Sequence, residues 1–371
     1  MTWDTIDFVI RSTVTWFFRS RNPESWIFRG AVAVLLVLHG ANWLFKYNGT
    51  LDGSPVSIEF GTEGAIHDGL LWGLSGLCAL LMIGSAGWAW KRYNDEQRRL
   101  SRKKVFVIEG RGLRDDDGSP LVAAVPETLL GTRVDYLLDL RQRRDGILVD
   151  PEDLLWPIES MKIWLRQAHK ANDRRDLTTV YGGLTAVPLT FLTGVLLDDE
   201  GDIFVMDWDR TTERWRSLNE PDDHMRFDVT GLEAVAGASE VVLAVSASYQ
   251  VKSEDLATTF NFPVVRMTML DFQSSHWSQA KQAALADQFL GVLKKLDALG
   301  VNQIHLVLAA QNSVAFNFGR RYDKRNLPKV TVYQFERSQD PRYPWGVEMP
   351  VAGVSNPRII STARESKPSR A

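Results

Sequence analysis

Apolar residues form long runs in the first hundred positions, and shorter apolar runs alternate with helical patterns after that. Residues 69–90 hold 22 positions without a charged side chain, between Asp68 and the pair Lys91 and Arg92. A helix of that length, at about 1.5 Å rise per residue, crosses the ~30 Å hydrocarbon layer of a membrane. We therefore predict a transmembrane helix over residues 69–90.

Residues 25–46 form a second candidate span, which Arg29, His39 and Asn42 interrupt. Arg29 lies near the start of that span, where a long side chain reaches the membrane surface. A cleaved signal peptide does not fit, because the apolar run starts late and no small-residue cleavage site follows it. The two runs predict a transmembrane hairpin, and a buried core hairpin is the alternative.

The charges that flank the two spans predict their orientation. Segment 47–68 contains no Lys or Arg, whereas the N-terminal arm 1–24 holds three arginines and the basic linker 91–104 holds seven Lys and Arg residues. Basic loops stay in the cytoplasm, so this asymmetry predicts a multi-pass protein of the plasma membrane with both termini cytoplasmic and 47–68 outside.

Small and polar residues mark both spans. The second span carries a stripe of glycines at helical spacing: Gly73, Gly76, Gly84 and Gly87. The first span carries two polar residues on one face, His39 and Asn42. Small residues allow helices to approach closely, and polar groups at membrane depth normally face protein or water. Two readings stay open: these residues pack the hairpin against itself, or they contact neighbouring protomers and line a wet path.

After the spans, one pattern of strands and helices occurs twice. Five pairs of segments match in the same order: 105–112 with 241–248, 134–142 with 265–273, 154–169 with 277–300, 178–194 with 305–319, and 202–208 with 329–335. The order β-β-α-β-α-β predicts parallel, Rossmann-like sheets. We therefore predict a membrane α-hairpin followed by two fused Rossmann-like halves, 105–238 and 239–350, related by a pseudo-two-fold axis.

Two smaller expectations follow from the same pattern. The fourth pair of segments ends at Gly194 and Gly319, where a glycine would cap each helix. The tail 351–371 is predicted to be solvated and disordered from about Pro357 onwards.

The predicted strand ends carry small, polar and basic residues. Ligands of open α/β sheets lie beyond the carboxyl ends of the strands, where helix N-termini favour phosphate. The candidate ligand-binding residues are Gly110, Arg111, Thr185, Arg210, Ser246, Ser248, Tyr249, Gln311, Asn312 and Ser313. Tyr249 is suited to stacking on a base, and Ser313 is placed to cap the following helix. The alternative is that the serines are plain helix caps and the arginines solvated charges.

Charge and composition exclude several classes of protein. The net charge is -3, and residues 1–104 hold 12 basic against 9 acidic residues, which leaves 31 against 37 for the rest. A net-acidic soluble part argues against a DNA- or RNA-binding surface. The single cysteine, Cys78, excludes an intrachain disulfide and a zinc finger.

Catalytic and metal-binding signatures are missing from the sequence. Gly110 and Gly112 are not followed by the third glycine of a dinucleotide fingerprint, and no P-loop, nucleophile elbow or zinc-protease motif occurs. We therefore expect no catalytic residues, no metal and no cofactor, and predict that the protein is not an enzyme.

Segments 184–215 and 304–337 resemble the two halves of a SAVED domain, a pair of fused CARF-like folds found in bacterial CBASS anti-phage effectors. The resemblance covers roughly 105–350, and the hairpin in front resembles the two-transmembrane SAVED effectors. It implies a cyclic tri- or dinucleotide ligand, supplied by a partner nucleotidyltransferase without direct contact. It also implies that ligand binding drives self-association, and that the hairpin then disrupts the lipid of the bacterial inner membrane.

Two other functions remain open from the sequence. One is a membrane-tethered enzyme that degrades the cyclic nucleotide, and the other is a constitutive membrane scaffold whose repeat binds protein. Turnover of the ligand would indicate the enzyme, and the lack of any ligand-dependent thermal shift would indicate the scaffold.

Overall fold

The computed structural model describes residues 23–40, 45–51, 54–60, 65–112, 120–144, 147–198, 201–272, 276–353 and 356–362. Residues 39–40, 45–51, 54–60 and 65–68 are described by their backbone alone. The chain divides into two compact units, Met1–Ser101 and Arg102–Ala371. Residues 1–22 of the N-terminal arm, Asn42 and the side chain of His39 lie outside what the structure describes.

The first unit contains two helices and a hairpin of strands: α2 (Pro23–Gly40), β1 (Phe45–Leu51), β2 (Ser54–Phe60) and α3 (Ala65–Arg102). The strands β1 and β2 pair antiparallel within the segment predicted as the outer loop. Of the described helices, α3 alone is long and apolar enough to cross a membrane by length and composition. It also continues without a break through most of the basic linker, whose Lys, Arg, Glu and Gln residues favour helix.

An ion pair joins the two helices of this unit near the basic linker. The Arg92 guanidinium donates to both carboxylate oxygens of Glu24, at 3.2 and 2.9 Å. The Glu24 side chain is fully buried, although it lies in the first turn of α2. The pair therefore fixes the start of α2 beside the end of the apolar stretch of α3.

The glycine stripe of α3 faces away from the side chains that this helix buries. Cys78, Ser85 and Ala89 are buried and share one face of α3. The predicted glycines lie on the opposite face, and a Cβ added at Gly73, Gly76, Gly84 or Gly87 would meet no described atom within 4 Å. The stripe is therefore not used for close packing within the described part of this unit.

The first half of the second unit is a five-stranded sheet in the order β4-β3-β7-β8-β9. Its elements are β3 (Lys104–Arg111), α4 (Leu121–Ala124), β4 (Thr132–Asp139), α5 (Leu155–Ala171), β7 (Leu177–Leu184), α6 (Val187–Leu196), β8 (Ile203–Asp209) and β9 (Arg214–Ser217). A small hairpin of β5 (Arg143–Arg144) and β6 (Ile147–Leu148) precedes α5. Neighbouring strands from β4 to β8 are parallel, and β9 closes the edge antiparallel.

The second half is a seven-stranded sheet in the order β10-β12-β11-β13-β14-β15-β16. Its elements are β10 (Phe227–Thr230), β11 (Glu240–Ser246), α7 (Ser253–Ala257), β12 (Val264–Met269), α8 (Gln279–Ala298), β13 (Gln303–Ala309), α9 (Asn312–Arg321), β14 (Lys329–Gln334), β15 (Trp345–Glu348) and β16 (Arg358–Ser361). Its parallel core repeats the strand order of the first half, and antiparallel strands extend it on both sides.

The predicted repeat β-β-α-β-α-β is confirmed, with two Rossmann-like halves. The prediction of a disordered tail is wrong for β16, which pairs with β15 at the sheet edge. Ile359 of that strand packs against the core, and Arg358 donates from Nε to Glu348 at 3.0 Å. One apolar contact and one ion pair thus hold β16 in place, although the composition of this segment is typical of a disordered C-terminus.

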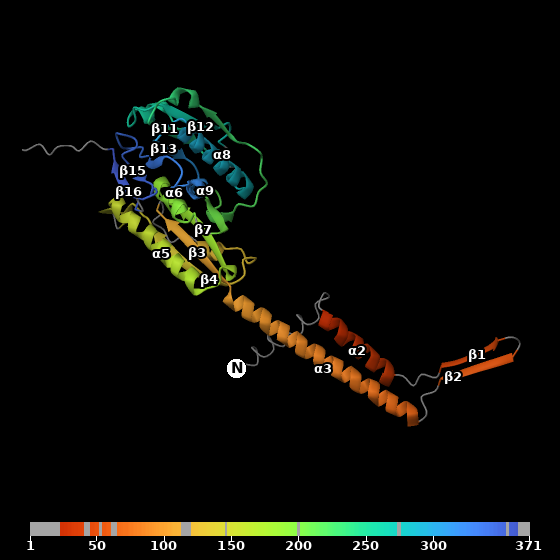
Figure 1. Ribbon diagram of the computed structural model, residues 1–371. Coiled ribbons are helices and arrows are strands. Elements are labelled where there is room, and N and C mark those ends of the chain that lie inside the picture. The colour runs from red at the N-terminus through yellow and green to blue at the C-terminus, as the bar shows by residue number, and fades with distance from the viewer. Residues whose placement is uncertain are drawn as a thin grey trace, which may run out of the picture. The chain divides into compact units, whose positions relative to one another are not determined.

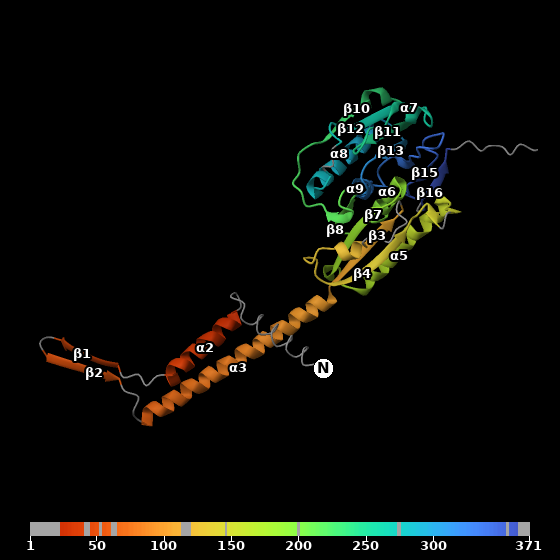
Figure 2. The ribbon, with the colours of Figure 1, turned by 180° about the vertical axis from the view of Figure 1, so that it is seen from behind.

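Gly194 and Gly319 lie inside helices, so the prediction that they cap them is wrong. They mark the point where α6 of one half crosses α9 of the other, between the two sheets (Figures 1 and 2). A Cβ built at Gly194 would lie 2.2 Å from the carbonyl oxygen of Phe316, and one built at Gly319 would lie 2.1 Å from that of Phe191. The helix backbones touch, and only glycine permits that approach.

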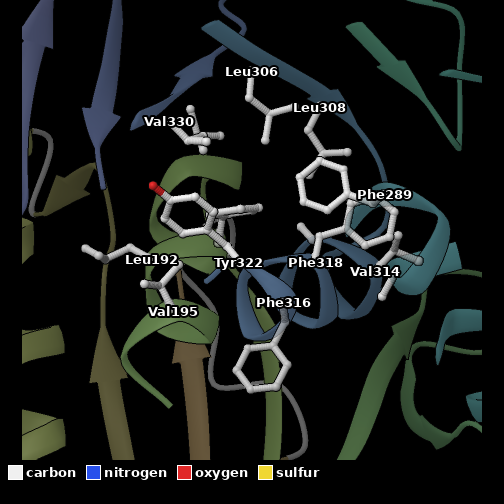
Figure 3. Packing of buried hydrophobic residues seen from close by; sticks show 14 of the residues in the cluster. Leu192, Val195, Phe289, Leu306, Leu308, Val314, Phe316, Phe318, Tyr322 and Val330 are labelled. Atoms are coloured by element: carbon white, nitrogen blue, oxygen red, sulfur yellow. The ribbon is translucent and has the colours of Figure 1, made fainter. Parts of the chain in front are cut away.

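Aromatic rings on α9 join the two halves into one core. Phe316 stacks on Tyr181 of the first sheet, with ring centroids 3.8 Å apart, and Phe318 stacks on Phe289 of α8 at 4.6 Å. Figure 3 shows Phe318 beside Phe289, on the side of α9 that faces Leu306 and Leu308 of the second sheet, and Phe316 on the opposite side of the helix. One continuous cluster of buried apolar residues therefore spans both halves.

The helix crossing predicts an unusual response to a small substitution. Gly319→Ala forces a methyl group into the backbone of α6, so we expect it to lower the free energy of unfolding by about 3 kcal/mol. Gly291→Ala is the matched control, because it is also a glycine within a helix, but no described atom lies within 4 Å of its Cβ position. It should stabilise the protein by roughly 0.5 to 1 kcal/mol. Thermal and denaturant unfolding of the full-length protein in nanodiscs measures both, and equal effects would contradict the crossing.

Candidate ligand-binding site

The carboxyl ends of the strands in the two halves meet around a cavity of about 420 Å³. Six of the ten predicted ligand-binding residues line this cavity: Thr185, Arg210, Ser248, Tyr249, Gln311 and Asn312. The first two come from the first half and the others from the second. The side chains of Trp208, His276 and Trp277 add aromatic surface to this cavity. We call this space the inter-half cavity.

The other four predicted residues do not line this cavity. Arg111 pairs with Glu109, its Nε 2.6 Å from Oε1. A Cβ on Gly110 would contact Thr185 at 3.1 Å, so this strand end is closed by packed side chains. Ser246 accepts a hydrogen bond from the backbone N–H of Val251 at 3.0 Å and is fully buried. The strand end at Gly110 is therefore filled, and Ser246 shapes the turn that follows its strand.

Asn312 fastens the second half to the first. Its side-chain oxygen accepts hydrogen bonds from the backbone N–H of Thr185, at 3.0 Å, and from the hydroxyl of Thr190, at 2.7 Å. Both bonds are buried, where a lost partner costs about 1 to 3 kcal/mol. Asn312 therefore stabilises the structure around the cavity through these two hydrogen bonds, and it also lines the cavity.

The N-terminus of α9 is capped from the other half of the molecule. Helix α9 starts at Asn312, and the preceding Gln311 makes no side-chain capping bond, so the prediction that Ser313 caps this helix is wrong. Instead the backbone N–H of Ser313 donates to the carboxylate of Asp207, at 3.1 Å. Asp207 comes from β8 of the first half and was not predicted. Burial raises the pKa of this carboxyl group, and the hydrogen bonds from Ser313 partly offset that.

His276 was also missed by the sequence analysis, because it belongs to no motif and lies just before α8. Its side chain is 9% exposed, and its Nε2 lies 3.6 Å from the carboxylate of Asp207. Burial, together with the nearby cations Arg216 and Lys281, lowers the pKa of His276 to about 4. The imidazole is therefore neutral at physiological pH.

A second hollow of about 490 Å³ adjoins the inter-half cavity at the carboxyl ends of β13 and β14. The two spaces share Val187, Tyr249 and Gln334. Tyr333, Phe335 and Tyr343 give the second hollow aromatic walls, and Lys252, Arg337 and Arg342 give it positive charge. We call this space the strand-end hollow.

Three cations around Tyr249 make no ion pair with an acid in the described ranges: Arg210, Lys252 and Arg337. Arg342 differs, because its Nε lies 3.6 Å from the Asp255 carboxylate. Tyr249 is 52% exposed, so its ring is open to a stacking partner. Unpaired cations beside an exposed aromatic ring suit a ligand that carries both phosphates and bases.

Metal chemistry has no support in the part of the chain that the structure describes, since no group of three or more His, Cys, Asp or Glu side chains is placed to hold an ion there. The arrangement of the site is that of a binding pocket, with side chains that accept, donate and stack.

Comparison with known families identifies both parts of the chain. The family model described as "SAVED-fused 2TM effector domain" matches residues 3–155. The family model described as "SMODS-associated and fused to various effectors sensor domain" (SAVED) matches residues 162–349. The protein is therefore a member of the SAVED family, with a two-transmembrane effector domain in front of its sensor domain. The effector model extends over β3 and β4, which the structure places in the sheet of the first half.

Solved structures of Cap4 SAVED/CARF-domain containing receptors are similar at low identity. The Acinetobacter baumannii receptor with the cyclic trinucleotide 2'3'3'-cAAA matches at a TM-score of 0.45 and 10% identity, over 76% of this chain and 60% of that one. Its complex with 3'3'3'-cAAA gives 0.45 and 12% over the same shares, and the Moraxella osloensis receptor gives 0.43 and 12% over 76% and 59%. The chain thus spans about 60% of the length of these receptors. No curated protein matches the chain.

The low pKa of His276 predicts a pH dependence of stability. In the unfolded chain His276 binds a proton below about pH 6.5, and in the folded state only below about 4. The unfolded state therefore gains a proton in that window, and stability falls as pH drops from 6.5 to 4, by about 3 kcal/mol from this group. Asp207 acts in the opposite sense, because its raised pKa favours protonation of the folded state.

The His276→Gln variant isolates this contribution. We expect its free energy of unfolding to change less than that of the wild type between pH 6.5 and 4, measured by denaturant unfolding of the full-length protein at several pH values. Parallel curves for the two proteins would show that His276 titrates as it does in an unfolded chain.

Proposed function

We propose that this protein is a membrane-anchored effector of bacterial anti-phage signalling of the CBASS type. In this proposal the SAVED domain binds a cyclic oligonucleotide in the inter-half cavity and the adjoining strand-end hollow. Binding promotes self-association, and the hairpin of α2 and α3 then disrupts the inner membrane. A nucleotidyltransferase supplies the ligand without touching the effector.

The observation that carries this proposal is the presence of both family domains in one chain, with a sensor cavity at the junction of the two halves. The cavity is small and polar, so it suits a small anionic ligand without the basic surface that a nucleic acid requires. The unpaired Arg210, Lys252 and Arg337 are the proposed partners of its phosphates, and Tyr249 that of a base.

The membrane topology is part of the proposal. Charge asymmetry favours a hairpin that crosses the membrane twice, with both termini in the cytoplasm, where a nucleotide signal is made. The helix α2 is short for a span, at 18 residues, or about 27 Å at the usual rise. The ion pair between Glu24 and Arg92 would then lie at the cytoplasmic membrane surface, within reach of water.

Ligand binding is tested by thermal shift of the full-length protein in nanodiscs with cyclic di- and trinucleotides. The first probes are the cyclic triadenylates that the Cap4 structures contain. We expect a ring of this class to raise the unfolding temperature, and Tyr249→Ala to weaken its binding roughly tenfold or more, since stacking on an aromatic ring contributes about 1 to 3 kcal/mol per base. Tyr249→Phe is the matched control and should bind as the wild type does. No shift with any ring would refute the sensor function.

Self-association is tested at the glycine face of α3. If that face contacts a second copy, Gly76→Leu and Gly84→Leu should abolish ligand-induced cross-linking in membranes, because a large side chain holds the helices apart. Ala86→Leu makes a similar change on another side of α3 and should leave cross-linking intact. Equal cross-linking in all three variants would exclude the glycine face as the contact.

A further inference from the structure

The inter-half cavity contains two hydrogen-bond acceptors that have no donor. Among the described side chains, His276 Nδ1 and Gln334 Oε1 are buried and make no hydrogen bond, and both residues line this cavity. Buried acceptors without a donor are rare in folded proteins, and each costs about as much as a lost hydrogen bond. Both belong to residues that line one cavity, so a ligand bound there is the source of donors that we consider.

The surroundings of His276 decide which of its nitrogens carries the proton. Nε2 faces the carboxylate of Asp207, which accepts backbone N–H groups from Ser313 and Trp208 and therefore acts as an acceptor. We therefore assign the hydrogen to Nε2, which leaves Nδ1 of the neutral ring as the acceptor. The low pKa of His276 keeps the ring in this form throughout the physiological range.

The orientation of the Gln334 amide is fixed in the same way. Its Nε2 donates to the carbonyl oxygen of Phe335, at 3.2 Å, and the amide also donates to the Glu336 carboxylate. Both neighbours are acceptors, so the amide nitrogen of Gln334 must face them. The amide oxygen is then the atom that has no hydrogen-bond partner. His276 and Gln334 therefore both carry an acceptor that has no donor in the described part of the chain.

We propose that the inter-half cavity selects a ligand base with an exocyclic amino group, whose N–H bonds His276 Nδ1 and Gln334 Oε1 accept. This inference rests on the proposed function and adds a specificity to it. Adenine and cytosine present such a group on the base edge, whereas hypoxanthine and uracil present a carbonyl oxygen at the same place. An oxygen there would face two acceptors, so rings with those bases should bind more weakly.

The test compares rings whose bases differ on one edge, where hypoxanthine has an oxygen in place of the adenine amino group and carries a hydrogen on N1. Cyclic di- and triadenylate are titrated against the full-length protein in nanodiscs beside cyclic di- and tri-inosinate, in which an oxygen replaces the amino group. The wild type should bind the adenylate ring roughly 10- to 100-fold more tightly than the inosinate ring of the same size. His276→Phe and Gln334→Leu should each reduce that ratio severalfold, mainly by weakening adenylate binding.

Two variants at separate positions, each checked by thermal unfolding, keep the test independent of a folding failure at one of them. Gln303→Leu is the matched control, because it makes the same change at the opposite end of the neighbouring strand β13, where the Gln303 amide donates to the Thr331 hydroxyl. It should leave the ratio unchanged.

The outcomes separate this inference from the proposed function. If both rings bind the wild type equally, or if the variants weaken both rings to the same extent, amino-group selection is wrong while the sensor function stands. If no ring of either base binds at all, the proposed function fails and this inference fails with it.

Discussion

The contact on which the second unit depends is the crossing of α6 and α9 at Gly194 and Gly319. At this point the backbones of two helices from different halves touch, which no side chain larger than hydrogen permits. The approach places Phe316 against Tyr181 and brings Asn312 within hydrogen-bonding distance of Thr185. The strand ends of the two sheets thereby face one another, and the cavity lies between them. Two halves that could have been separate domains share one core.

The same crossing explains why a duplicated fold makes an asymmetric site. In the first half, Thr185 packs over Gly110 and Gly112, and the strand end is closed. In the second half, the carboxyl ends of β13 and β14 open onto the strand-end hollow. The first half instead supplies Asp207, which caps α9 and faces His276. The first half thus supplies structural contacts to the site, and the second half supplies most of its open surface.

Much of the fold could be predicted from the sequence, because strand and helix periodicity are local. The repeat, the order of its elements and the parallel sheets follow from the apolar pattern, and the long apolar stretch of α3 from its lack of charge. The role of Gly194 and Gly319 could not be predicted, because a glycine near a helix end looks like a cap unless its partner helix is known. The strand β16 was missed for a similar reason, since Glu348 and the core that hold it are distant in sequence.

The site could be predicted in part. Thr185, Gln311 and Tyr249 follow strand ends, which is a local signal, and the structure brings them to one cavity. Asp207, His276 and Gln334 gave no such signal. Their importance comes from burial and from partners in the other half or in neighbouring turns, and neither property can be read from spacing. Ser246 and Ser313 show the converse, because a polar side chain after a strand can be occupied by partners within the fold. The Ser246 hydroxyl accepts from the backbone N–H of Val251, and the Ser313 hydroxyl accepts from the side-chain amide of Gln282.

In the proposed function, occupancy of the inter-half cavity makes the hairpin of α2 and α3 permeabilise a membrane. The most direct test is release of a dye from vesicles that contain the full-length protein, as cyclic triadenylate and other cyclic nucleotides are titrated in. We expect release that depends on ligand concentration in the wild type and is lost when Arg210 and Lys252 are both replaced by alanine. Release that is the same with and without every ligand, or that the double variant retains in full, would contradict it.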